Sequence, residues 1–237
     1  MSRAQSWFWL LATVLLAGGF AGLGFWQAGR AAWKQQWLEA WAQALVATPV
    51  ELDAAMQAPL AGVPLKVRAE LEFLPEPVLW LDNQQHGGRV GVRAYALARV
   101  AGGEVPILVE LGWLPFGPTR SLPPLTLPVG SLRLQGLLLP WPGQGLRLGE
   151  NRWEGPDATR LLAYLDRAEI ARHTGLSLYD GVLRPDPEPD FGAEREITAL
   201  PNTLSPEQHR GYAVQWWGLS VTVVVIHLLL GLRRRKT

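Results

Sequence analysis

The stretch WFWLLATVLLAGGFAGLGFW, residues 7–26, decides what class of protein this chain belongs to. It contains no charged side chain, and as a helix it would be about 30 Å long, which matches the hydrocarbon core of a bilayer. The apolar run is longer than that of a typical signal peptide, and no clean small-residue cleavage site precedes FWQAGR (25–30). We therefore expect a retained transmembrane helix over 7–26.

A second apolar stretch, GYAVQWWGLSVTVVVIHLLLGL (211–232), has His227 as its one strongly polar ionisable group and predicts a second transmembrane helix. A basic tail, 233–237, follows it. Arg3 and RRRK (233–236) flank the outer ends of the two spans, so the positive-inside rule places both termini in the cytoplasm. The part between the spans, 30–207, is then an exported, periplasmic domain.

The charge of this middle part excludes one class of partner. Six of the 22 Lys and Arg residues lie outside 30–207, which leaves 16 basic residues against all 21 Asp and Glu, a net charge of about −5. Binding to nucleic acid needs clustered basic residues on an accessible face, so we expect no nucleic-acid partner. The chain has no cysteine, which excludes disulfides and thiolate metal sites.

Periodicity in the middle part predicts an α+β, mainly β domain. A helix is expected over 31–49, because Trp33, Trp37, Trp41 and Leu45 repeat every four residues, and we expect this stripe to pack on the domain rather than on a membrane surface. Alternation and turn residues then predict strands within 63–73, 77–84, 89–100, 105–114, 131–139 and 176–185.

A second helix is expected over 157–173 in this domain. Its apolar residues follow helical spacing, Asp157 is a suitable N-cap, and Gly175 is suited to the position after the C-cap. The fold class that results is a membrane protein in which two transmembrane helices flank one exported domain.

The sequence offers no set of catalytic residues, so an enzyme is not expected. Nucleophile-elbow, HExxH and Walker patterns are absent. The informative residues lie where the spans meet the exported side, in FWQAGR (25–30) and HRGYAVQWW (209–217). An interfacial aromatic belt explains the tryptophans, but Gln27 and Gln215 lie close to the apolar boundary, where a carboxamide needs a partner.

Several motifs, in this order, resemble the Surfeit-locus protein 1 family, called Shy in bacteria. They are LGFWQAGRAAWKQQ (23–36), DNQ (82–84) with GVRAYALARV (91–100), ILVELGWLP (107–115) and HRGYAVQWWGL (209–219). The resemblance covers essentially the whole chain. Two departures indicate a divergent member: Leu111 stands where the family usually has arginine, and Gln215 stands where it usually has threonine.

The resemblance implies an assembly factor for a haem-copper cytochrome oxidase in the bacterial plasma (inner) membrane. Family members that bind haem a deliver or insert it into the catalytic subunit of the oxidase, so that subunit is an expected partner and haem a synthase a further one. The residue carried over as haem ligand, and hence as metal ligand, is His209. Neutral imidazole is a common axial ligand of haem iron, which agrees with this role.

The site hypothesis places HRGYAVQWW on one wall and FWQ on the other. His209 would ligate the iron, and the apolar faces of the ring would be covered by Trp26, Tyr212 and Trp216. Gln27 and Gln215 would position polar groups or brace the helices, and Arg30 and Arg210 would pair with the propionates or anchor the helices at the interface.

Alternatives stay open at this stage. His209 is equally well explained as a polar cap of the second span, and His227 either rivals it as ligand or reaches the cytoplasmic headgroups. For the whole protein, the alternatives are a structural membrane chaperone that grips an oxidase subunit without haem and an exported sensor or enzyme domain.

Overall fold

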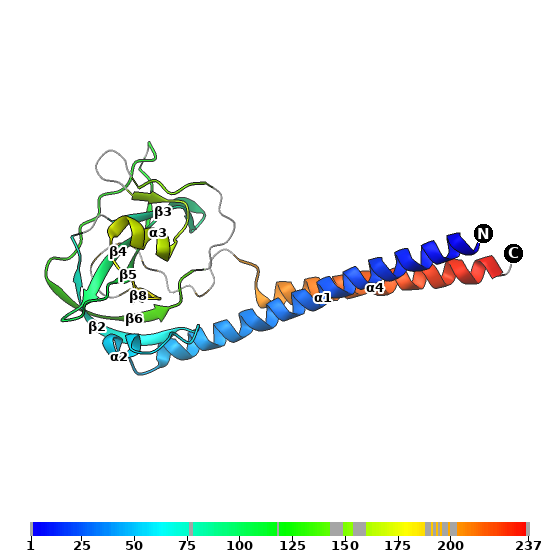
Figure 1. Cartoon of the computed structure of the whole chain (residues 1–237), viewed down its shortest axis with the longest axis horizontal. Coiled ribbons are helices and arrows are strands. Elements are labelled where there is room, and N and C mark those ends of the chain that lie inside the picture. Colours follow the sequence, from blue (N-terminus) through cyan, green and yellow to red (C-terminus); the bar gives the residue numbers. More distant parts are fainter. Residues whose placement is uncertain are drawn as a thin grey trace. The chain divides into compact units, whose positions relative to one another are not determined.

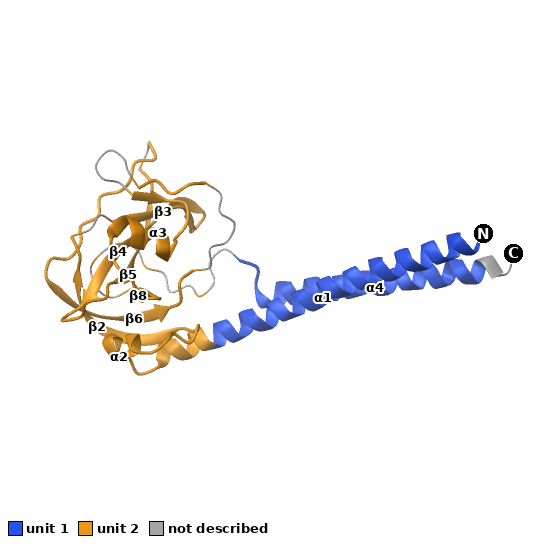
Figure 2. Ribbon diagram, in the orientation of Figure 1, with its two compact units in different colours: residues 1–39, 200–237 blue, residues 40–199 orange. Residues whose placement is uncertain are grey.

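The structure, a computed structural model of the chain, describes residues 2–75, 78–117, 119–142, 149–153, 160–187, 191, 193, 195, 199 and 203–235. The chain divides into two compact units, residues 1–39 with 200–237 and residues 40–199 (Figure 2). The first unit contains the long helical segments, and the second contains a mixed β-sheet with two short helices (Figure 1).

Two long helices, α1 (Arg3–Val46) and α4 (Pro206–Arg235), are the candidate membrane spans. The span and the helix predicted to follow it form one uninterrupted helix, α1. Only 11% and 6% of the most apolar windows of α1 and α4 are buried, whereas a core helix of a soluble protein would be mostly buried. These two helices indicate a two-pass membrane protein.

The last residues of α1, from residue 40 on, belong to the second unit, where Trp41 is buried and its ring centroid lies 5.5 Å from the guanidinium carbon of Arg184. The predicted stripe is only partly packed, because Trp33 is 46% exposed. Residues four apart drift by about 40° around a helix, so a stripe of this spacing leaves the packed face. The buried positions of α1 after residue 30 follow mixed spacing instead and are Ala31, Lys34, Trp41 and Ala44.

The second unit is built on one eight-stranded sheet with the order β1-β2-β6-β8-β5-β4-β3-β7. Antiparallel pairs dominate, and β1–β2, β5–β8 and β3–β7 are parallel. An additional pairing of β2 with β4 closes β2, β6, β8, β5 and β4 into a ring. The strands are β1 (Val50–Glu51), β2 (Leu65–Phe73), β3 (Leu79–His86), β4 (Arg89–Val100), β5 (Ile107–Pro115), β6 (Ser131–Leu139), β7 (Arg160–Leu162) and β8 (Val182–Pro185), and the short helices are α2 (Leu52–Met56) and α3 (Arg167–Thr174).

Strands β4 and β5 are buried on both faces because each separates two apolar clusters. Along β5, Ile107, Val109 and Leu111 enter the main core, whereas Leu108 enters a second cluster that includes Ile170 of α3. Successive strand residues point to opposite faces, so this alternation is the expected one. Leu111 is fully buried in the main core, so this position serves packing in this chain.

The helix predicted over 157–173 is wrong in its first part. Residues 160–162 form β7, which pairs parallel to β3, and α3 begins only at Arg167. The N-cap is Asp166, whose carboxylate accepts the backbone N–H of Glu169 at 3.1 Å, whereas Asp157 lies outside the described residues. Gly175 ends the helix at a φ of 70°, as predicted.

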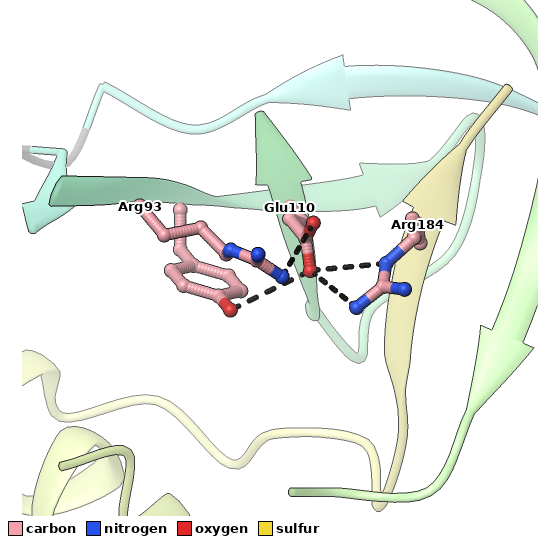
Figure 3. A network of polar contacts seen from close by, with 4 residues as sticks. Arg93, Glu110 and Arg184 are labelled. Atoms are coloured by element: carbon pink, nitrogen blue, oxygen red, sulfur yellow. Dashed lines mark hydrogen bonds and ion pairs between the residues drawn. The ribbon is translucent and has the colours of Figure 1, made fainter. Parts of the chain in front are cut away.

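A buried ion network lies on the second-cluster face of β5 (Figure 3). Glu110 is 4% exposed and accepts from Arg93 of β4 at 3.2 Å and from Arg184 of β8 at 3.1 and 3.2 Å. The hydroxyl of Tyr95 lies 3.5 Å from the same carboxylate. Burial, and next the charge of Glu110, raise the pKa of Tyr95, so the phenol stays protonated and can donate.

Candidate functional site

His209 of α4 and Gln27 of α1 meet where the two helices pack together. His209 is 6% exposed, and its Nδ1 lies 2.5 Å from Oε1 of Gln27. A carboxamide oxygen can only accept a hydrogen bond, so Nδ1 carries the proton and Nε2 keeps its lone pair. The carboxamide of Gln27 therefore has a partner across the helix pair, and it sets the tautomer of the imidazole.

Further contacts hold α1 and α4 in antiparallel register. Trp216 stacks on Phe20 with ring centroids 5.6 Å apart, and the hydroxyl of Ser220 donates to the carbonyl of Ala17 at 2.8 Å. Farther along, Nδ1 of His227 lies 2.9 Å from the hydroxyl of Thr13. Residue numbers fall along α4 as they rise along α1, so the polar contacts form one seam between the helices.

The predicted site residues of α1 lie on one side of this seam. Successive residues of an α-helix are about 100° apart around its axis. With Gln27 facing α4, Trp26 and Arg30 therefore lie on one flank of α1 and Ala28 lies on the other. Trp26 is 61% exposed and Arg30 is exposed as well, so both present their side chains outward from the helix pair.

The same geometry divides the predicted residues of α4. Tyr212 and Gln215 lie on one side of His209 and Arg210 on the other. Arg210 and Ala28 line the same hollow, which identifies the second flank of the pair. Tyr212 and Gln215 therefore share the flank of Trp26 and Arg30, with Gln27, His209 and Trp216 at its inner edge. Arg210 does not lie with them.

The hollow on the flank of Arg210 has a volume of about 520 Å³. Its walls are mostly small or apolar, with Trp217 as the largest side chain. Its polar residues are Arg210 of α4 and three residues from the part of α1 beyond the span. The residues that line it are Ala28, Ala31, Ala32, Gln35, Gln36, Glu39, Arg210, Ala213, Val214 and Trp217. Small residues of this kind allow another apolar chain to approach the helix backbones closely.

Lys34 is a buried cation that the sequence reasoning missed. It is 3% exposed, and its ammonium donates to the hydroxyl of Thr203 at 2.9 Å and to the carbonyl of Leu204 at 2.5 Å. Its position offered a signal, because it comes two helical turns after Gln27 and so faces the same way. Lys34 ties the segment before α4 to α1 and places a positive charge on the His209 side of the helix pair.

The donor chemistry of this arrangement fits a haem held by one histidine. Haem iron takes an axial imidazole through the nitrogen that bears the lone pair, and the second ring nitrogen of such a ligand usually donates to an oxygen. His209 and Gln27 show this state. Among the described residues, no group of three or more His, Asp or Glu is arranged to hold a metal ion.

Gly24 is a second point of close contact between α1 and α4. A β-carbon at Gly24 would meet Nε1 of Trp217 at 2.3 Å, whereas one at Gly22 would meet nothing within 4 Å. We predict that Gly24→Ala destabilises the full-length protein in detergent by about 1–3 kcal/mol, because the indole must be displaced. Gly22→Ala should be neutral or slightly stabilising, since alanine favours a helix.

Thermal unfolding of the two variants, side by side with the unmodified protein, checks this expectation. Equal melting temperatures for Gly24→Ala and Gly22→Ala would show that the indole does not pack on Gly24.

A comparison with protein families identifies the family to which this sequence is similar. A sequence model of the SURF1 family matches residues 14–221, which include both candidate spans in large part and the whole sheet. No curated protein sequence matches the chain significantly.

Proposed function

Since this chain belongs to the SURF1 family, we propose that it is an assembly factor for a haem-copper cytochrome oxidase and that it handles haem a on the way to the catalytic subunit. The family supports a role in oxidase assembly. The observation that carries the haem step is the hydrogen bond between His209 and Gln27. It leaves the lone pair on Nε2 of a neutral imidazole available to ligate iron.

The residues on the Trp26 flank would share the work of holding the cofactor. Haem a supplies an iron atom with an open axial position in a planar, mostly apolar ring. His209 would donate Nε2, and Gln27 would hold the ring of His209 in orientation through its Nδ1–H. Trp26, Tyr212 and Trp216 would cover apolar surface, Gln215 would bond polar substituents, and Arg30 would pair with a propionate as a charge-assisted donor.

Arg210 is left out of this assignment because it lines the hollow on the opposite flank. A site on the outside of two helices suits a carrier, since an amphiphilic ring can reach it from the bilayer without crossing water. A site with one histidine would also hold the cofactor less tightly than a site with two, which would favour release.

The experiment that tests the proposal is purification of the full-length protein from cells that make haem a, followed by an absorption spectrum. A haem a spectrum in the purified protein, together with an oxidase that lacks haem a when the protein is deleted, is the expected pair of results. Protein without bound haem, in cells whose oxidase still requires it, would reject haem handling and keep the assembly role.

That second outcome corresponds to the alternative function, a structural chaperone that grips an oxidase subunit. The hollow lined by Ala28, Ala32 and Ala213 favours it, because small residues are typical of the surfaces where membrane helices pack. Its signature would be oxidase subunit that co-purifies with the protein whether or not haem a is made.

We also propose that both termini are cytoplasmic and that the sheet domain is periplasmic. Five of the six basic residues outside 30–207 lie at the two ends of the chain. Reporter fusions at either terminus are expected to be active only with a reporter that works in the cytoplasm. Activity of a periplasmic reporter at the C-terminus, in a protein that still supports oxidase assembly, would contradict this topology.

A further inference from the structure

His227 repeats the arrangement of His209 at the other end of the seam. The two histidines are 18 residues apart on α4, which is five helical turns, so they share one azimuth and lie about 27 Å apart. Each of them contacts a polar side chain of α1, Gln27 in one case and Thr13 in the other. The helix pair thus has one imidazole near each end of its apolar length.

The protonation state of His227 follows from the bonds of Thr13. The hydroxyl of Thr13 donates its proton to the carbonyl of Trp9 at 2.8 Å. Towards His227, at 2.9 Å, this hydroxyl can therefore only accept, so Nδ1 of His227 carries the proton. Nε2 keeps the lone pair, as it does in His209.

The lone pair on Nε2 of His227 lacks a hydrogen-bond donor among the described residues. In the part of the chain that the structure describes, Nε2 of His227 accepts no hydrogen bond. The residue lies in the apolar part of α4, where an unpaired polar atom facing acyl chains is costly and an ionisable residue indicates function. Trp9, one turn before Thr13, is 52% exposed and provides an aromatic surface beside the pair.

We propose that His227 is a second axial-ligand position for an iron porphyrin, so that the helix pair can hold the cofactor near either membrane face. This inference rests on the proposed function. Binding forms a coordinate bond from Nε2 to iron, and no proton is released, because Nδ1 keeps its hydrogen and its bond to Thr13. One iron cannot use both histidines, given their separation, so two positions imply two equivalents of cofactor.

The test is a spectroscopic titration of the full-length protein in lipid nanodiscs with ferric protoporphyrin IX. Two equivalents should bind to the unmodified protein, one to His209→Ala, one to His227→Ala and none to the double variant. Thr13→Val keeps the imidazole and removes the acceptor of its N–H, and it should weaken the second equivalent about 10–100-fold. Ser220→Ala removes a hydrogen bond between the helices but no imidazole, and it should still bind two.

The outcomes separate the two ideas. Suppose that the unmodified protein binds one equivalent, that His209→Ala loses it and that His227→Ala keeps it. The second position then does not exist, and the proposed function stands. If the unmodified protein binds none, the haem step of the proposed function fails and the second position fails with it. If His227→Ala unfolds, His227→Gly is titrated with and without added imidazole, and recovery of the second equivalent by imidazole supports ligation, whereas no recovery counts against it.

Discussion

Replacing His209 by alanine should lower the haem a content of the oxidase about tenfold or more when the variant is the only copy of this protein in the cell. In the proposed site the imidazole of His209 would supply the iron ligand, and its tautomer is set by a bond of 2.5 Å to Gln27. Without it, the aromatic side chains on that flank would hold only the edge and faces of the proposed haem ring. The measurement is the haem a content of the isolated oxidase, with the variant protein confirmed to be present at its normal level.

Two further variants make this prediction specific to ligation. Gln27→Leu keeps the imidazole but removes its partner, and it should weaken haem binding about 10–100-fold, the usual effect of losing such a support. Arg210→Ala changes the residue next to His209 on the opposite flank and should leave haem content unchanged. If Arg210→Ala and His209→Ala lower it equally, the assignment to the Trp26 flank is wrong.

Removing Glu110 should destabilise the sheet domain by about 3–5 kcal/mol, because Glu110→Ala leaves two guanidinium groups buried without their carboxylate. The side chains of Arg93 and Arg184 are only 17% and 13% exposed, so water cannot replace the lost partner. Thermal or denaturant unfolding of the full-length protein, followed at the domain transition, measures the loss.

A matched control is the ion pair between Arg68 and Glu51, which is shorter than the Glu110 pairs, at 2.6 Å, but has both side chains 54% exposed. Glu51→Ala should change the free energy of unfolding by less than about 1 kcal/mol. In addition, replacing Arg93, Glu110 and Arg184 together by Met, Leu and Met should restore most of the stability, since apolar residues of similar size often replace a buried ion group well. A loss of the same size in Glu110→Ala and Glu51→Ala would mean that burial does not govern the network.

Much of the fold could be predicted from the sequence because its elements carry a period. β4 and β6 have the predicted bounds, 89–100 and 131–139, since both alternate and both are bounded by glycine or proline. The strands β1 and β7 could not be predicted, because two or three residues hold no period and their conformation depends on pairing with β2 and β3. Leu161 and Leu162 then suggested a helix by spacing alone.

The candidate site was predictable only as a set of residue types. The sequence indicates that Gln27 needs a partner and that His209 is unusual, but their bond joins residues 182 positions apart. It depends on the register of two helices, and register is a property of the packed pair rather than of either segment. For the same reason, the separation of Arg210 from Trp26 onto opposite flanks, and the bond of Lys34 to Leu204, needed the structure.

The position of β8 in the closed ring sets the order in which the domain can be made. β8 lies between β6 and β5, although it is the last strand among the described residues, and it ends at Pro185, shortly before α4 begins at Pro206. Until that strand is synthesised, β5 and β6 each keep an unpaired edge, which is the kind of surface that pairs with other chains. The newly made domain therefore stays vulnerable to aggregation through most of its synthesis, and it can become a closed ring only shortly before α4 is made.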